Sequence, residues 1–241
     1  MTDFHAHILP GADHGSDGME TSLTQLALAE AAGVDTIIAT PHYYPQIDRF
    51  SNFLALRERT FSELMNRYHG PIRILPAAEV HMCVGLDHLN GIEELCIPGT
   101  DVILSELSFR GYAGNMGETF TRMLDDGLLP ILAHVDRYSH TLIENYFSLG
   151  LYGQVNADAL TRHFGRKQLV EWIDEGFVLA LGSDIHGTVP GYAPFEKARA
   201  FLGERAHVLD QAAARLLSET KLPGEGRMPH LRTSLSFLKK G

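Results

Sequence analysis

The sequence has little cysteine and no long apolar segment. Cys83 and Cys96 are the only cysteines among 241 residues, and two free thiols are a simpler expectation than a bond between them. No apolar run reaches the roughly 18 residues of a membrane-spanning helix. The opening letters MTDFHAH contain no apolar signal segment. The sequence therefore supports neither export nor membrane insertion, and we expect a cytoplasmic protein.

Basic residues are also scarce. The 20 Lys and Arg residues are outnumbered by 30 Asp and Glu residues, which leaves a formal net charge of -10. Binding to the backbone of nucleic acids requires a surplus of cations that displaces condensed counterions. The composition therefore disfavours a nucleic-acid partner, although a local basic patch would be compatible with it.

The chain does contain the material of one α/β domain. Hydrophobic residues make up 44% of it, enough for a buried core. Short apolar runs rich in β-forming residues recur at 2–7, 34–40, 72–78, 101–107, 130–135, 152–157 and 177–183. Most of the segments between these runs have apolar residues at helical spacing. Alternating strands and helices predict a parallel sheet.

The number of repeated units favours a barrel. Seven βα units without a Rossmann-type glycine fingerprint favour a distorted (β/α)7 barrel, and an open doubly wound sheet is the alternative. We expect a single domain over 1–241, in which 204–241 forms a C-terminal helix, with its clearest signal at 211–219, and a basic tail. The stretch 187–194 is expected to be a loop over the mouth of the barrel.

Histidine is abundant, with 13 residues, and its placement is ordered. His5 and His7 lie two apart on the first predicted strand, so the pleat places both on one face. Such a pair alone is weak evidence for a metal. Further ligand-type residues end or follow the other strands, namely His42, Glu79, Glu106, His134, Asp184 and His186. In a parallel barrel these strand ends share one rim, where active sites assemble.

The donor types indicate a catalytic metal site. Imidazole nitrogens and carboxylate oxygens without cysteine suit Zn, Fe or Mn, with positions left open for water and substrate. The remaining histidines lack strand-end placement and are expected to be solvated or structural: His69, His81, His88, His140, His163, His207 and His230.

At this point the motifs resemble a known superfamily. H-A-H at 5–7, D-H-G at 13–15, A-T-P-H at 39–42, A-E at 78–79, S-E-L at 105–107, H-V-D-R-Y at 134–138 and S-D-I-H at 183–186 are similar to the successive motifs of the PHP (polymerase and histidinol phosphatase) superfamily. The opening F-H-A-H-I-L-P-G-A-D-H-G, A-T-P-H-Y-Y and H-V-D-R-Y most resemble the capsule-type (CpsB/CapC) bacterial tyrosine phosphatases. The resemblance covers residues 3 to about 190.

Two motifs depart from the capsule-type pattern. The usual D-D-G has His14 at its centre here, and the usual H-P-E-R-Y has Val135 and Asp136 in place of Pro and Glu. His14 is closer to the wider superfamily, so the resemblance indicates a phosphoesterase more firmly than a tyrosine phosphatase.

The resemblance implies two or three divalent ions (Mn, Zn or Fe) and a division of their ligands. One ion would take His5, His7, Glu79 and Asp184, a second Glu79, Glu106 and His134, and a third His14, His42 and His186. Arg137 matches the family's phosphate-facing arginine. Asp13 would either support a ligand or donate a proton.

The implied function is that of a metal-dependent hydrolase of phosphoric monoesters. The resemblance implies a protein tyrosine phosphatase that acts on the tail of a bacterial tyrosine kinase of exopolysaccharide or capsule synthesis, by direct attack of a metal-bound hydroxide. No cysteine nucleophile is expected, because neither cysteine begins a C-x5-R loop. A site open to a protein tail predicts aromatic residues at its rim, with Tyr43, Tyr44, Phe109, Tyr112 and Tyr192 as candidates.

Three other functions remain open. A small-molecule phosphatase, such as a histidinol-phosphatase, could use the same metals. Polymerase-associated members act on nucleic-acid ends, which the acidic composition disfavours here. A non-catalytic binding module, in which metals only stabilise the barrel, is the alternative of another class.

Overall fold

The computed structural model describes residues 1–108 and 116–218. Phe109, Tyr112, His230 and the expected tail beyond residue 218 lie outside the described residues. Within them, strands and helices alternate along most of the chain and every paired strand is parallel. The predicted α/β class is therefore confirmed.

All of the predicted strand runs contain a strand. The strands are β1 (Thr2–Ala6), β2 (Thr36–Ala39), β3 (His42–Tyr43), β4 (Arg73–Pro76), β5 (Glu79–His81), β6 (Val102–Glu106), β7 (Leu129–Leu132), β8 (Tyr152–Asn156) and β9 (Val178–Gly182). The short strands β3 and β5 were not predicted. Each directly continues a predicted strand after a break of two residues.

These breaks divide the ladder into two sheets. One has the order β1-β2-β4 and the other the order β3-β5-β6-β7-β8-β9. Pro41 lies in the first break and has no N–H to donate to a ladder. The backbone still links the two sheets, because the Glu79 N–H donates to the Pro41 carbonyl at 3.1 Å.

The opposite edges of the two sheets also meet. The Asp184 N–H donates to the His5 carbonyl at 2.8 Å, and Ala6 forms an isolated parallel bridge with Ile185. The expected succession of strands is present, with β2/β3 and β4/β5 each counted as one interrupted strand. A single closed barrel is not confirmed, since the hydrogen-bonded strands form two sheets.

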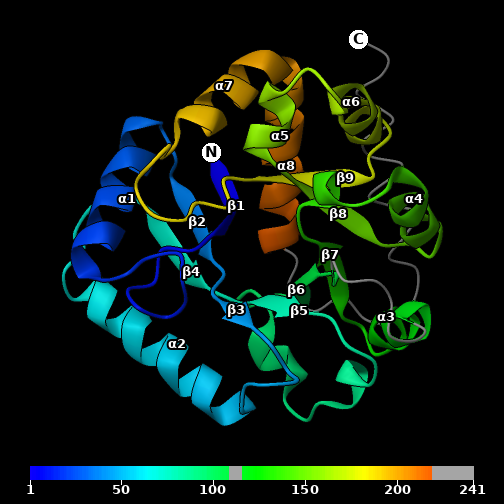
Figure 1. Ribbon diagram of the computed structural model, residues 1–241, viewed down its shortest axis with the longest axis horizontal. Helices are drawn as coiled ribbons and strands as arrows, with labels where there is room; N and C mark the ends of the chain where they lie inside the picture. Colours follow the sequence, from blue (N-terminus) through cyan, green and yellow to red (C-terminus); the bar gives the residue numbers. More distant parts are fainter. Residues whose placement is uncertain (109–115, 219–241) are drawn as a thin grey trace.

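Helices surround the strands (Figure 1). They are α1 (Met19–Ala31), α2 (Phe50–Met65), α3 (Met116–Asp125), α4 (His140–Ser148), α5 (Ala157–Thr161), α6 (Arg166–Asp174), α7 (Ala193–Leu202) and α8 (Glu204–Ser218), with short 3-10 turns η1 (Leu86–His88), η2 (Ile92–Leu95) and η3 (Val135–Arg137). The described part of the chain contains no helix that is both long and apolar enough to cross a membrane.

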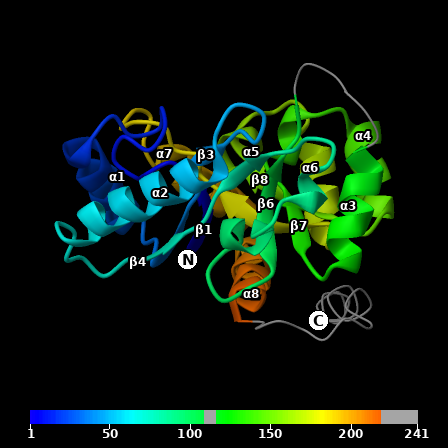
Figure 2. The ribbon, with the colours of Figure 1, turned by 90° about the horizontal axis from the view of Figure 1, so that it is seen from below.

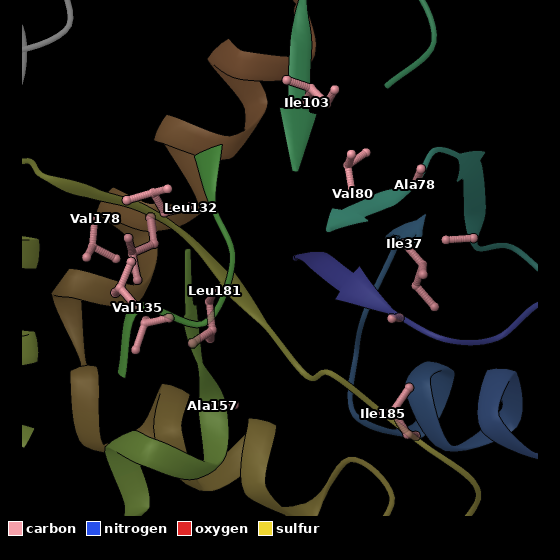
Figure 3. Close-up of a cluster of buried hydrophobic side chains, with 14 of the residues drawn as sticks. Ile37, Ala78, Val80, Ile103, Leu132, Val135, Ala157, Val178, Leu181 and Ile185 are labelled. Carbon is pink, nitrogen blue, oxygen red and sulfur yellow. The ribbon is translucent and has the colours of Figure 1, made fainter. Parts of the chain in front are cut away.

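Alternating strand residues divide the core into two parts. Ile37, Val80, Ile103, Leu132 and Leu181 belong to the larger cluster, which includes buried residues of the surrounding helices (Figure 3). Neighbouring strand residues point the other way. These alternate residues form a second, smaller cluster together with helix α8. Helix α8 lies beside the strands on the side of the N-terminus (Figure 2). The opposite ends of the strands are left to carry the polar site.

Two expectations at the C-terminal side need correction. Helix α8 begins at Glu204, earlier than the signal at 211–219 indicated, because its buried face is made largely of small alanines with a weak apolar pattern. The loop expected over 187–194 ends at Tyr192, because Pro194 lies in the first turn of α7, where its missing N–H costs little.

Candidate metal centre

His5 and His7 face one another in the middle of the site. Their Nε2 atoms lie 3.0 Å apart, and both side chains are fully buried. The His5 Nδ1 lies 3.1 Å from the Gln154 Oε1, and the His7 Nδ1 lies 2.7 Å from the Asp13 Oδ2. These oxygens only accept hydrogen bonds, so each Nδ1 carries a proton and each Nε2 faces inward. Two nitrogens that face one another at this distance hold either a proton or a bound cation between them.

Glu79 supplies the central carboxylate from the start of β5. Its Oε2 lies 3.2 Å from the Nε2 of both His5 and His7 and 2.9 Å from the His42 Nδ1. Its Oε1 lies 2.8 Å from the His134 Nε2. Burial raises the pKa of this carboxyl, but the charge of His5 and the hydrogen bonds of His134 and His42 hold it well below its usual range. One carboxylate oxygen therefore faces three imidazole nitrogens.

Glu106, at the end of β6, extends the site. Its Oε1 lies 3.5 Å from the His134 Nε2, and its Oε2 lies 3.1 Å from the His81 Nδ1. Burial raises the pKa of Glu106, but hydrogen bonds from His134 and His81 outweigh burial and lower it to about 2. The contact to His81 corrects the expectation that this histidine is merely solvated or structural, because β5 orients it toward the site.

His186, His42 and His14 gather on the other side of His7. The rings of His186 and His42 lie 4.1 and 4.4 Å from the ring of His7. The exposed His14 stacks on His42 at 4.8 Å with an angle of 8°. The His186 Nδ1 lies 3.0 Å from the Asp184 carbonyl oxygen, and its buried Nε2 has no hydrogen-bond partner among the described residues.

Asp184 and Arg137 lie at the edge of the centre. The Asp184 Oδ1 is 3.6 Å from the His5 Nε2 and 3.4 Å from the His7 Nε2. Its Oδ2 accepts hydrogen bonds from the Arg137 guanidinium and, at 2.8 Å, from the Asn156 amide. Burial raises the pKa of Asp184, but the charges of His5, His7 and Arg137 hold it well below its usual range. Arg137 is 42% exposed and so remains open to solvent.

Asp13 organises the loop that follows β1. Besides His7, it accepts the backbone N–H of His42 at 3.0 Å and that of Gly15 at 2.8 Å. Burial raises the pKa of Asp13, but the hydrogen bond and charge of His7 hold it far below its usual range. Asp13 is thus an anion that orients His7. Of the two roles expected for it, this geometry favours support of a ligand over proton donation.

Ligand atoms converge in three groups within 4.8 Å: His5, His7 and Asp184; His42, Glu79 and Glu106; and His7, His42 and His186. The first group lies within one expected ligand set. The other two differ from the expected sets because His42 reaches Glu79 and because His7 takes the place of His14. These imidazole nitrogens and carboxylate oxygens fit divalent cations of intermediate hardness, such as Zn, Fe or Mn.

Sequence reasoning missed three supporting residues. Gln154 and Asn156 alternate on β8, and the Gln154 Oε1 also accepts the His134 N–H at 2.8 Å. Two amide side chains two residues apart in an apolar strand share one face of it, so they could have been predicted to support a polar site. The Tyr138 Oη lies 3.3 Å from the His134 Nδ1 and donates to the Leu107 carbonyl at 3.0 Å. Tyr138 closes the H-V-D-R-Y motif, but no role was expected for it.

The expected rim aromatics are only partly found at the rim. Tyr44 lies there, with its ring 5.4 Å from that of His42 and 5.5 Å from that of His81. Tyr43 is only 2% exposed and packs on Phe53, because adjacent strand residues point in opposite directions. Tyr192 is also 2% exposed and donates to Asp3, so it belongs to the interior.

The parallel strands and the imidazoles and carboxylates at their carboxyl ends define the class: an α/β protein with a candidate metal site at one end of its strands. The family model for capsular polysaccharide synthesis, CpsB/CapC, matches residues 1–218. The chain therefore belongs to the CpsB/CapC family, which confirms the resemblance that its motifs carried.

Several relatives carry names that describe an activity. The chain is 26% identical over 198 residues to tyrosine-protein phosphatase YwqE of Bacillus subtilis, covering 77% of each chain. It is 25% identical over 208 residues to tyrosine-protein phosphatase CpsB of Streptococcus pneumoniae, covering 77% of this chain and 83% of the relative.

Solved structures show the same fold. Crystal structures described as YwqE from Bacillus subtilis and CpsB from Streptococcus pneumoniae, metal-dependent tyrosine phosphatases, match with a TM-score of 0.75 at 21% identity, covering 92% of this chain and 96% of the other. A histidinol phosphate phosphatase from Lactococcus lactis matches with a TM-score of 0.54 at 13% identity, covering 85% of this chain and 93% of the other.

Proposed function

We propose that this chain is a metal-dependent phosphomonoesterase that acts as a protein tyrosine phosphatase. One observation carries the metal dependence: the inward-facing Nε2 atoms of His5 and His7 lie 3.0 Å apart, and each lies 3.2 Å from the Glu79 carboxylate. The names of the family's relatives support the choice of substrate class.

The proposed centre holds two or three divalent ions (Mn, Zn or Fe). His5, His7 and Asp184 would hold one ion, and Glu106 and His134 would hold another, with Glu79 shared. His42 and His186 would hold a third, with His14 beside them. When bound, such ions lower the pKa of coordinated water and polarise phosphoryl oxygens.

The chain's own residues would position the phosphoryl group. Arg137 offers several N–H donors in a planar fork, suited to phosphoryl oxygens, and is partly exposed at the edge of the centre. Asn156 and Arg137 hold Asp184, while Gln154 and Asp13 fix the proton positions of His5 and His7.

The proposed physiological substrate is the phosphorylated tail of a bacterial tyrosine kinase of exopolysaccharide synthesis, in the cytoplasm. The family's link to capsular polysaccharide synthesis supports this choice. A kinase tail is a flexible polypeptide, which suits a site with Tyr44 at its rim.

Relative rates on three substrates test this function. A phosphotyrosine peptide should be hydrolysed with a higher kcat/KM than histidinol phosphate, with no release from a 3′-labelled oligonucleotide. The activity should be lost on chelation and should be insensitive to vanadate at levels that block cysteine-based phosphatases. A preference for histidinol phosphate would overturn the assignment as a tyrosine phosphatase.

The variant His134→Ala separates a catalytic centre from a purely structural one. Loss of a ligand should lower kcat by orders of magnitude with a modest change in the melting temperature. A large loss of stability with unchanged specific activity of the folded fraction would instead show that the metal held at His134 only stabilises the fold.

A further inference from the structure

A cavity of about 400 Å³ opens directly beside the metal centre. His42, a proposed metal ligand, forms one end of it together with Ala12. The loop residues 47–49 and the first turns of α2 form the rest. Its volume lies within the range of roughly 300–1,000 Å³ that is usual for ligand pockets. His42 is thus common to this cavity and to the candidate metal centre.

The lining combines an apolar surface with polar groups. Ile47 is 79% exposed, and Leu56 of α2 lines the same cavity. Leaving so large an apolar side chain in water is unfavourable by comparison with covering it. Because Ile47 borders a cavity that shares His42 with the proposed catalytic centre, an apolar group of a bound substrate would cover it.

The polar side chains of the cavity are one base, one acid and one amide, besides His42. Arg49 is exposed, and the described residues give its guanidinium no hydrogen-bond or ion-pair partner. The Asp48 Oδ2 accepts the Tyr44 N–H at 2.9 Å, so part of its charge is already engaged within the loop. Asn52 adds an amide with a donor and an acceptor. This mixture suits the alternating carbonyls and N–H groups of a polypeptide.

We propose that this cavity binds the residues that flank phosphotyrosine in a protein substrate. An apolar side chain of the substrate packs on Ile47 and Leu56, and its main-chain carbonyls accept hydrogen bonds from Arg49 and Asn52. The proposal rests on the proposed phosphatase function of the adjacent centre. It makes the cavity a determinant of specificity for polypeptides, because a small phosphomonoester has no atoms that reach it.

The test compares two substrates that share the same ester. One is a synthetic phosphotyrosine peptide with several residues on each side, including apolar ones, and the other is N-acetyl-phosphotyrosine amide. The variants Ile47→Ala and Arg49→Gln should each lower the ratio of kcat/KM for the peptide to that for the amide by roughly 3- to 10-fold, chiefly through KM, the size expected for one lost contact. Arg49→Lys should recover part of the loss.

Matched controls lie outside the cavity. Arg59→Gln removes an exposed arginine of α2, and Val84→Ala trims an exposed apolar side chain elsewhere. Both should keep the wild-type ratio. A wild-type ratio in Ile47→Ala and Arg49→Gln would overturn this proposal alone, with the phosphatase function intact. A wild-type protein that hydrolyses neither substrate would overturn the proposed function itself.

Discussion

At the scale of single residues, the site depends on which nitrogen of each histidine carries the proton. A neutral imidazole has one donor and one lone pair, so an acceptor on one nitrogen turns the lone pair of the other inward. Gln154 does this for His5 and Asp13 does it for His7. These partners are therefore as much a part of the centre as the ligands they orient.

Gly15 of the D-H-G motif is required for close packing against a ligand. A Cβ atom at this position would lie 2.0 Å from the His7 Cβ and 2.8 Å from the His7 carbonyl oxygen. We expect Gly15→Ala to displace His7 and to lower metal content and phosphatase kcat by at least ~10-fold, as for other changes that disturb a ligand's orientation. Elemental analysis and a phosphatase assay measure both.

The matched control is Gly18→Ala, three residues further along the same loop. A Cβ atom there meets nothing within 4 Å. Equal metal content and activity in the Gly15→Ala and wild-type proteins would show that the position of His7 does not depend on the close approach of Gly15.

Metal binding should release protons at neutral pH. In the metal-free protein, burial lowers the pKa of His134, but hydrogen bonds with Glu106 and Glu79 outweigh burial and raise it to about 9. His134 is therefore protonated at neutral pH and must lose its proton to bind a metal. Metal affinity should rise as the pH increases toward about 9 and then level off.

Calorimetric titration with Mn²⁺ in two buffers of different ionisation enthalpy measures this release. The observed heats should differ between the buffers in proportion to their ionisation enthalpies. Heats that are independent of the buffer would contradict the protonated state of His134 in the metal-free protein.

At the scale of elements, the ends of the strands aim the ligands. His134 follows β7 with a φ of 33°, and Asp184 follows β9 with a φ of 51°. Left-handed backbone at a residue other than glycine is uncommon and is usually maintained by its surroundings. The local change of direction turns both side chains into the centre.

This geometry explains what the sequence could and could not predict. Periodicity located the apolar strand runs and placed candidate ligands at their carboxyl ends, because those signals are local. It did not reveal the pairing of β3 with β5, which aligns His42 with Glu79. Nor did it reveal the register of β5 against β6, which brings His81 to Glu106. Contacts of this kind depend on tertiary register, which no window of sequence contains.

The junction between β1 and the segment after β9 is held by a buried carboxylate. Asp3 accepts the Ser183 N–H at 2.8 Å and hydroxyl at 2.6 Å, and the Tyr192 hydroxyl donates to it at 2.7 Å. Tyr192→Phe removes one donor from this buried group and should lower the free energy of unfolding by about 1–3 kcal/mol. Urea denaturation of the metal-free protein measures the change, and an unchanged midpoint would contradict this role.

At the scale of the whole molecule, an acidic chain gathers its proposed cation-binding groups at one end of a parallel fold. The formal net charge is -10, and helix α8 covers the strands on the side of the N-terminus. The apolar interior therefore ends where the ligand-bearing strand ends begin. Composition indicated one domain, and the family match over residues 1–218 agrees with the reach of the motifs.

The central claim is that imidazoles and carboxylates from distant parts of the chain hold a cluster of divalent ions on which the activity depends. The most direct test is elemental analysis of the purified protein together with its phosphatase rate, before and after chelation and after readdition of Mn, Zn, Fe or Mg. We predict more than one divalent ion per chain, with metal and activity lost together and regained together. Full activity in protein that contains no divalent metal would contradict the account.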